Sequence, residues 1–265
     1  MPRILIVAGS DSGGGAGIQA DIKTITALGG YAMTAITAIT VQNTLGVHGV
    51  HVIPPEIIAQ QMQVVIEDIG VDIIKLGMLG DVATIHAIAD VLEHDTHIPV
   101  ILDPVMTAKG GARLLQQHAL DALKARLIPR ATLITPNLPE AEQLLACAIT
   151  SVQHMREAAK KVHDAYGCAV LMKGGHGEGA QIVNLLHTGD GSYAMHSQRI
   201  DTPHTHGTGC TMASAIALRY GLGDDLYHAC LFAQHYVHGA IVRAPHFGGG
   251  HGPLHHGWCI EQKLS

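Results

Sequence analysis

The sequence predicts an α/β protein built on a central, mainly parallel sheet, with helices on both faces and an antiparallel edge. Short β-rich runs alternate with helical patterns from Arg3 to Met172, which is typical of β-α-β units. After Gly174 two strand-like runs follow each other closely and add the antiparallel edge. With 265 residues, 47% of them hydrophobic, the chain is long enough for the core of one domain, residues 1–265.

The predicted elements follow one another in order along the chain. The β-rich runs lie at Arg3–Ala8, Ala35–Val41, Val71–Leu76, Pro99–Leu102, Thr132–Thr135 and Cys168–Met172. The helical patterns between them lie at Ala16–Leu28, Pro55–Asp68, Val82–Glu93, Gln117–Arg126, Glu140–Ala148 and Val152–Tyr166. The closely spaced strands are predicted at Gln181–Leu186 and Ser192–Arg199, and two last helices at Thr211–Tyr220 and Leu226–Val242. A tail rich in Gly, His and Pro closes the chain.

Composition narrows the classes of partner. The net charge is −6 and only 3% of the residues are aromatic, so we expect a small-molecule ligand and no nucleic acid. No run is long enough to span a bilayer and the apolar start Ile4–Ala8 is too short for a signal peptide, so we expect no membrane partner and a cytoplasmic location. The five cysteines form no Cys-x-x-Cys pair, and the 20 histidines show no metal-binding spacing.

Polar and glycine-rich segments follow the predicted parallel strands. In an open parallel sheet, ligands bind beyond the carboxyl ends of the strands. These segments are Gly9–Gly17, Gln42–Thr44, Gly77–Gly80, Asp103–Met106, Thr135–Asn137 and Lys173–His176. Any one of them is explained by an ordinary strand-to-helix turn, but together they predict a binding crevice at one edge of the sheet.

The segment Thr205–Cys210 predicts an anion hole. Gly207 and Gly209 allow a tight turn whose N–H groups approach a ligand, and the helix that follows adds unpaired N–H donors and the positive end of its dipole. In such a field the pKa of Cys210 is expected to be lowered, so that its thiolate acts as a base toward a substrate hydroxyl. The alternative is a glycine-rich turn with Cys210 as a small apolar packing residue.

The sequence contains neither common nucleotide-binding fingerprint. The first glycine loop does not fit Gly-x-Gly-x-x-Gly, and the absence of a Gly-Lys dipeptide excludes a Walker A loop. Asp103, Asn137 and Glu140 offer oxygen ligands of the type that Mg²⁺ accepts, although Glu140 is also explained as a charge in the first turn of its helix. Lys173 is either a phosphate ligand or a solvated lysine.

Three further side chains are candidates for holding a flat ring. The amide of Gln42 donates and accepts side by side, as the edge of an aminopyrimidine-like ring requires, or it is buried polar structure. Met78 and Val105 offer apolar walls for the ring, or they belong to the core. The loop Thr107–Arg113 carries glycines suited to a hinge and is expected to close over bound ligands.

Several of these segments together resemble one family. They are Ala8–Asp21, Thr40–Thr44, Leu102–Met106, Ile134–Glu142, Lys173–His176 and Thr205–Cys210. The chain resembles, over nearly its whole length, the hydroxymethylpyrimidine/phosphomethylpyrimidine kinases of thiamine biosynthesis, which have the ribokinase-like fold. The resemblance implies ATP-dependent phosphorylation of 4-amino-5-hydroxymethyl-2-methylpyrimidine, then of its monophosphate to the diphosphate, with Mg²⁺ and in a homodimer.

The resemblance also implies roles for individual residues. Cys210, in a position where many ribokinase-like enzymes have an aspartate base, acts in catalysis with Gly207, Gly209 and Lys173. The substrate is expected to contact Gln42, Gly9, Asp21, Met78 and Val105. ATP is expected to contact Asn137, Lys173 and Thr208, and Mg²⁺ to be organised by Asp103 and Glu140.

One position departs from the family pattern. Many relatives have a lysine where this chain has Gln234, so a cation near the phosphates is missing or is replaced in part by His235. We expect Gln234→Lys to favour use of the monophosphate. Other functions remain open at this point: a pyridoxine-type or hydroxyethylthiazole kinase of the same fold, a pyrimidine-binding protein without turnover, and a thiol redox enzyme that uses Cys210.

Overall fold

The computed structural model describes residues 1–108, 110–116, 118–175 and 179–260. Within these ranges it contains one nine-stranded sheet in the order β3-β2-β1-β4-β5-β6-β7-β8-β9. The strands are β1 (Arg3–Asp11), β2 (Tyr31–Asn43), β3 (Gly46–Val52), β4 (Ile73–Leu76), β5 (Val100–Leu102), β6 (Leu133–Ile134), β7 (Ala169–Met172), β8 (Gln181–Thr188) and β9 (Gly191–Gln198). Lys109, Gln117 and His176, which belong to predicted segments, lie outside the described residues.

The helices alternate with the strands, as predicted. They are α1 (Gly17–Ala27), α2 (Pro55–Asp68), α3 (Val82–His94), α4 (Ala119–Ala122), α5 (Leu138–Leu145), α6 (Val152–Tyr166), α7 (Thr208–Gly221) and α8 (Leu226–Val242). A π-helical turn (Leu123–Leu127) and a 3-10 turn (Ile128–Arg130) continue α4. The described part of the predicted helix Gln117–Arg126 is therefore divided between two short elements, α4 and the π-helical turn.

The sheet is parallel in its centre and antiparallel at both edges. Strands β2, β1, β4, β5, β6 and β7 pair in parallel, and β8 and β9 add the predicted antiparallel edge. The other edge was not predicted: β2 continues past Val41 and pairs antiparallel with β3 in a hairpin. The prediction that Gln42 lies in a loop after the second strand was therefore wrong, because Gln42 pairs with Val47 inside this hairpin.

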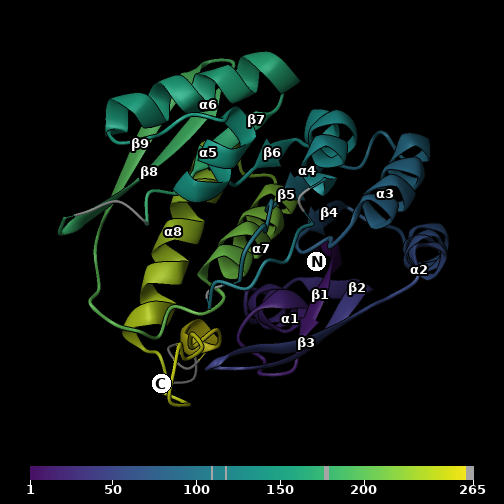
Figure 1. The fold of residues 1–265 in the computed structure, drawn as a ribbon, viewed down its shortest axis with the longest axis horizontal. Coiled ribbons are helices and arrows are strands. Elements are labelled where there is room, and N and C mark those ends of the chain that lie inside the picture. Colours follow the sequence, from purple (N-terminus) through teal and green to yellow (C-terminus); the bar gives the residue numbers. More distant parts are fainter. Residues whose placement is uncertain (109, 117, 176–178, 261–265) are drawn as a thin grey trace.

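Alternating side chains of the central strands divide the core into two layers. In β1, Leu5 and Val7 belong to one cluster, whereas Ile4 and Ile6 belong to the other, because successive side chains of a strand point to opposite faces. The first cluster packs beneath α2 to α6, and the second packs beneath α1, α7 and α8. Figure 1 shows these two sets of helices on the two sides of the sheet. The predicted α/β architecture is confirmed.

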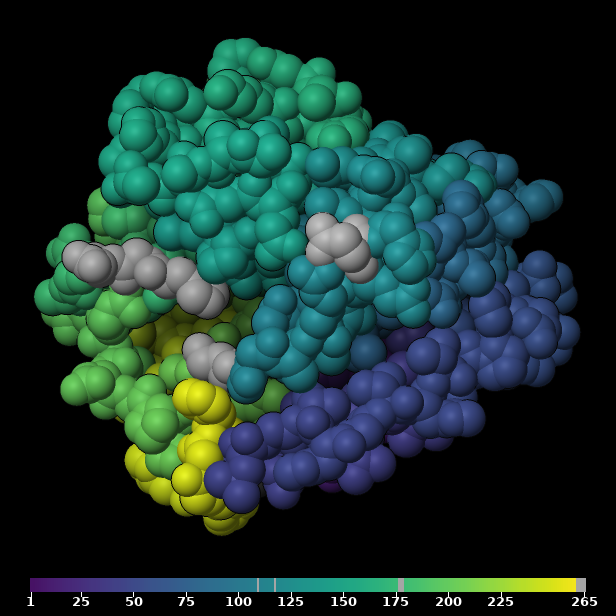
Figure 2. Space-filling model, viewed as in Figure 1, coloured from purple at the N-terminus to yellow at the C-terminus, as the bar shows by residue number. Residues whose placement is uncertain are grey.

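The topology brings the polar segments to one edge of the sheet. The parallel strands β1, β4, β5, β6 and β7 end at this edge. The segments that begin at Gly77, Asp103, Thr135 and Lys173 follow β4 to β7, whereas the Gly9–Gly17 segment begins inside β1, which runs to Asp11 and not to Ala8 as predicted. The start of α7 and the β2–β3 hairpin complete the surroundings. In Figure 2 the surface is hollowed where the blue hairpin faces the teal segment that follows β5.

Candidate active site

The predicted crevice is a cavity of about 530 Å³ at the carboxyl ends of the parallel strands. It brings together nearly all of the residues predicted for the site. Those that line it are Gly9, Gln42, Met78, Asp103, Val105, Asn137, Glu140, Lys173, Gly207, Thr208, Gly209 and Cys210. Thr107 and Ala108, from the loop predicted to close, also line it. Asp21 is the predicted site residue that does not.

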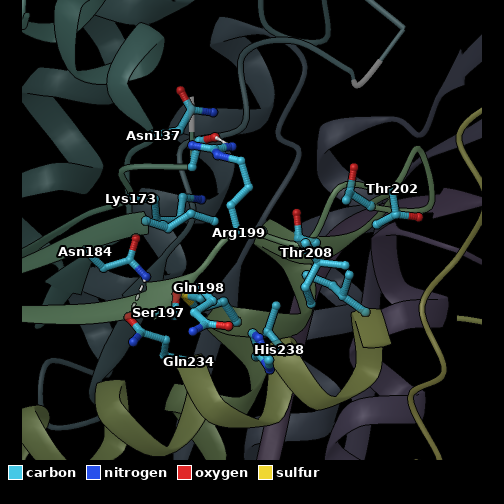
Figure 3. Close-up of a pocket in the computed structure, with 18 of the residues that line it drawn as sticks. Asn137, Lys173, Asn184, Ser197, Gln198, Arg199, Thr202, Thr208, Gln234 and His238 are labelled. Carbon is cyan, nitrogen blue, oxygen red and sulfur yellow. Dashed lines mark hydrogen bonds between the residues drawn. The ribbon is translucent and has the colours of Figure 1, made fainter. Parts of the chain in front are cut away.

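A second cavity, of about 370 Å³, adjoins the first. Its walls come from β8, β9, the segment after β9 and one side of α8. Figure 3 shows Lys173 and Asn137 on one side of this cavity and Gln234 and His238 on α8 on the other. The two cavities share Asn137, Lys173, Thr205, Thr208 and Gly209, so the predicted anion hole lies at their junction.

Two glycines shape the predicted anion hole, and the backbone requires glycine at the first of them. Gly207, at the N-cap of α7, has φ +85°, and a Cβ atom there would collide with the carbonyl oxygen of Gly15. At Gly209 a Cβ atom would lie 3.2 Å from Nζ of Lys173 and 3.3 Å from Oδ2 of Asp103. Gly209 therefore leaves space open between the helix start, an ammonium group and a carboxylate, which is where a phosphoryl group would fit.

Lys173 is a structured cation rather than a solvated lysine. Its Nζ donates to Oδ1 of Asp103 at 2.7 Å, and Thr135 Oγ1 donates to the same oxygen at 3.0 Å. Burial alone would lower the pKa of Lys173, but the carboxylates of Asp103 and Glu140 raise it overall. Burial alone would raise the pKa of Asp103, but the charges of Lys173 and Lys75 outweigh the effect of burial and lower this pKa overall. Both groups are therefore charged at neutral pH.

Glu140 lies in the first turn of its helix and also faces the crevice, so its placement agrees with both interpretations of the sequence. It forms a capping box at the start of α5: its Oε2 accepts from the Asn137 N–H at 2.8 Å, and the Asn137 side chain accepts from the Glu140 N–H at 2.9 Å. It also lines the first cavity. Burial raises the pKa of Glu140 to about 7, with Asp103 adding to the increase and Lys173 opposing it.

The pKa of Cys210 departs from the prediction. Burial raises the pKa of this thiol to about 11, and the carboxylates of Asp21 and Asp103 add to the increase, against the opposing charge of Lys75. The expected lowering was wrong, because loss of water and two nearby anions outweigh the favourable helix start. Cys210 stands at the predicted place but rests as a thiol.

Asp21 was predicted to contact the substrate, and the structure places it behind the cavity wall. It is fully buried, its Oδ2 accepts from Nζ of Lys75 at 2.8 Å, and its Oδ1 accepts from Ser214 Oγ at 2.6 Å. Lys75 itself lines the first cavity. The sequence analysis missed Lys75, although a lone lysine inside the apolar strand run Val71–Leu76 is a signal for a buried partner.

Lys75 is a buried charge beside the reactive groups. Burial alone would lower its pKa, but the negative charge of Asp21, with contributions from Cys210 and Asp103, raises it overall. Lys75 therefore stays protonated in its ion pair with Asp21, and its positive charge lies at the wall of the first cavity, beneath the anion hole. Asp21 itself lines neither cavity, and its link to the first cavity is its ion pair with Lys75.

Two other polar residues of the first cavity were missed. Asp11 lines it from the end of β1 and His206 from the anion-hole segment, with His206 Nε2 2.9 Å from Asp11 Oδ2. His206 also lies 3.1 Å from the Gln42 side-chain nitrogen. The sequence held one signal for His206 as a site residue, which is its position inside the Thr205–Cys210 segment.

Gln234 belongs to the wall of the second cavity, away from the predicted pyrimidine pocket. It is buried, its Oε1 accepts from Asn184 Nδ2 at 2.8 Å, and its Nε2 donates to the His196 carbonyl at 3.0 Å. Figure 3 shows the hydrogen bond between Asn184 and Gln234 as a dashed line. Asn184 Oδ1 in turn accepts from the N–H of Gly174, the residue after Lys173. His235 is exposed and does not line either cavity, whereas His238 lines the second one.

This arrangement predicts a loss of stability for Gln234→Lys, in addition to the expected effect on the monophosphate, which stays a prediction. A lysine cannot accept the hydrogen bond from Asn184, and its ammonium would be buried without a carboxylate. We expect the variant to lose about 1–3 kcal/mol of unfolding free energy. Urea denaturation measures this loss. The double variant Asn184→Asp/Gln234→Lys supplies the carboxylate and should recover most of it; a single variant as stable as the wild type would contradict this account.

The described residues contain no group of three or more His, Cys, Asp or Glu side chains placed to hold a metal ion. None of the five cysteines, all of which lie among the described residues, forms a disulfide. No helix among the described residues is long and apolar enough to cross a membrane.

Comparison with known proteins identifies the family. The phosphomethylpyrimidine kinase family matches residues 11–255. The chain belongs to this family. It is 49% identical over 258 residues to the thiamine biosynthesis bifunctional protein ThiED of Geobacter sulfurreducens, covering 97% of this chain but only 53% of that protein. It is 45% identical to the hydroxymethylpyrimidine/phosphomethylpyrimidine kinase of Bacillus subtilis, covering 96% of this chain and 94% of that protein.

A solved structure supports the same conclusion about the fold. The ADP complex of Bacillus subtilis pyridoxal kinase superposes with a TM-score of 0.90 at 35% identity, covering all of both chains. The fold of this chain is therefore the ribokinase-like fold that the sequence predicted.

Proposed function

We propose that this chain transfers a phosphoryl group from ATP to the hydroxymethyl group of 4-amino-5-hydroxymethyl-2-methylpyrimidine, and then to the resulting monophosphate, in thiamine biosynthesis. One observation carries the proposal: two cavities meet at an anion hole that contains Lys173 and Gly209. Phosphoryl transfer depends chiefly on positioning and charge stabilisation, and a junction of this kind supplies both.

Each cavity suits one substrate. The first has Gln42 for the polar edge of a pyrimidine, apolar walls from Met78 and Val105, and Cys210 beside the reacting hydroxyl. The second extends from Asn137 and Thr208 along α8 and is assigned to ATP. The shared Lys173 is assigned to the phosphates, and Gly9 to close packing against the ring.

The carboxylates present fit a magnesium ion held jointly with phosphates. Mg²⁺ keeps several waters and meets proteins through one or two carboxylates, so a larger cluster is not needed. Oδ1 of Asp103 accepts hydrogen bonds from Lys173 and Thr135, whereas Oδ2 faces the space at Gly209. Glu140 lines the same cavity. We assign Asp103 and Glu140 to the ion, which would neutralise phosphate charge when bound.

The raised pKa of Glu140 predicts a pH-dependent requirement for magnesium. The carboxyl binds a cation only when ionised, and with a pKa of about 7 it is mostly protonated at pH 6 and mostly ionised at pH 8. We expect the Mg²⁺ concentration for half-maximal rate to rise about tenfold from pH 8 to pH 6. Steady-state rates over a magnesium series measure this. Glu140→Gln is the matched control, because glutamine keeps the hydrogen bond to the Asn137 N–H at the start of α5. This variant should need more Mg²⁺ for half-maximal rate than the wild type, and the concentration needed should no longer change with pH.

A second candidate function is phosphorylation of a pyridoxal-type alcohol, favoured by the likeness to Bacillus subtilis pyridoxal kinase. ADP release from ATP, measured with the aminopyrimidine alcohol, pyridoxal and hydroxyethylthiazole, separates the candidates. The proposal predicts the highest kcat/KM for the aminopyrimidine alcohol. A higher value for either other alcohol would overturn it, and ligand binding without ADP release would favour a pyrimidine-binding protein.

We propose further that residues 1–265 work as one kinase domain, in the cytoplasm and as a homodimer. Five cysteines without a disulfide among them suit a reducing compartment. The hairpin at the sheet edge exposes the apolar side chains of Ile39, Val41, Val50 and Val52, which a second copy would cover. Light scattering after size-exclusion chromatography is expected to give twice the mass of the chain; a monomer mass would overturn the dimer.

A further inference from the structure

Polar groups from separate segments meet around the Gln42 side chain in the first cavity. Nε2 of Gln42 lies 3.1 Å from Nε2 of His206, and Oε1 of Gln42 lies 3.2 Å from Oγ1 of Thr40. The nitrogen and oxygen of a carboxamide are distinguished by their hydrogen-bond partners. These two contacts therefore decide which way the amide of Gln42 points.

Asp11 determines where His206 carries a proton. Its carboxylate accepts N–H groups from Gly13, Gly15 and Ala16 in addition to its contact with His206. Burial alone would raise the pKa of Asp11, but His206 and these backbone donors lower it overall, so it is ionised. An ionised carboxylate only accepts hydrogen bonds, so Nε2 of His206 carries a hydrogen and cannot accept one from Gln42.

Thr40 leads to the same orientation independently. Its Oγ1 lies 2.9 Å from the carbonyl oxygen of Ser10, closer than it lies to Gln42. A hydroxyl has one hydrogen, and donating it to Ser10 leaves a lone pair facing Gln42. The one hydrogen on Nε2 of His206 points to Asp11 and is shared with a second acceptor, so the amide fits both neighbours when the Gln42 oxygen faces His206 and its NH₂ group faces Thr40.

We propose that His206 is a positioning residue that determines substrate specificity by fixing this orientation of the Gln42 amide. The inference rests on the proposed function. An aminopyrimidine edge presents an N–H donor beside a ring-nitrogen acceptor, and it matches an amide oxygen beside an amide N–H in only one order. Because the hydroxymethyl group must point to Cys210, the ring cannot turn over to correct a reversed amide. His206 thereby selects the amino edge.

The 4-oxo analogue of the alcohol tests this inference, because its carbonyl and ring N–H reverse the donor and acceptor. We expect the wild type to prefer the amino alcohol by at least about 10²-fold in kcat/KM, since the analogue leaves two mismatched polar pairs. His206→Phe frees the amide to turn, and the preference should fall below about tenfold. His206→Gln keeps an N–H donor at this position and should retain most of the preference.

The possible outcomes separate the inference from the proposed function. An unchanged preference in His206→Phe, with both rates lowered equally, would show that His206 only supports the fold and would overturn the inference. A wild type that uses both alcohols equally would also overturn it, whereas a wild type that phosphorylates neither overturns the proposed function. If His206→Phe does not fold, His206→Met removes the same N–H donor with a flexible side chain: a reduced preference supports the inference, and an unchanged one overturns it.

Discussion

Replacing Cys210 with alanine is expected to lower turnover about 10²–10⁴-fold without unfolding the protein, because it removes a positioned proton acceptor from an intact anion hole. The pKa of about 11 adds a pH signature. Below this pKa the thiolate fraction rises tenfold per pH unit, so kcat of the wild type should rise steeply between pH 7 and 9. Steady-state rates across this range, with thermal melts to verify folding, measure both effects.

Cys210→Ser is the matched control for this role. A serine hydroxyl keeps the size and a hydrogen-bonding group but does not ionise in this pH range. If Cys210 is the base, serine should be nearly as inactive as alanine, and the rise with pH should disappear in both variants. Near-wild-type activity in either variant would assign Cys210 to packing. Cys210→Asp is expected to retain more activity than alanine, because a carboxylate can accept the proton.

Lys75→Met is expected to cost about 3–5 kcal/mol of unfolding free energy, since it leaves the carboxylate of Asp21 buried without its cation. Both side chains are fully buried, and Ser214 alone would remain as a polar partner of Asp21. Chemical denaturation of the wild type and the variant measures the loss. It should be larger at pH 8 than at pH 5, because burial raises the pKa of Asp21 and protonation relieves the unpaired charge at low pH.

The double variant Lys75→Met/Asp21→Leu separates the ion pair from simple packing. Replacing both partners by apolar residues removes the unpaired charge, so most of the lost stability should return. Turnover should remain low in the double variant, because the positive charge beneath the anion hole is still absent. The single variant Asp21→Leu completes the comparison: a double variant that loses as much stability as the two single variants together would contradict a coupled pair.

Much of the fold was predictable because local signals agree with it. Helices α2, α6 and α8 have the bounds that the sequence pattern predicts. Ser151 fixes the start of α6 and Asp225 fixes the start of α8. The side chain of each accepts a hydrogen bond from the backbone N–H three residues later in the chain. Strand β3 was missed because Gly46–Val52 contains two glycines and two exposed histidines and has no apolar run.

The site was predictable where chemistry follows strand ends and unpredictable where it depends on burial. Asp103 follows β5 and Lys173 follows β7, with only β6 between them in the sheet, so the topology brings both to one edge. The raised pKa of Cys210 and the pairing of Asp21 with Lys75 required knowledge of which side chains lose water. Asp21 and Lys75 are 54 residues apart, and no local pattern joins them.

We expect one site of this protein to phosphorylate the alcohol and then its monophosphate. The most direct measurement is to incubate the protein with ATP, Mg²⁺ and 4-amino-5-hydroxymethyl-2-methylpyrimidine and to identify the products over time by mass spectrometry and ³¹P NMR. We expect the monophosphate to form first and the diphosphate to follow at its expense, with one ADP released in each step. Absence of any phosphorylated pyrimidine, while the same protein phosphorylates pyridoxal, would contradict the account.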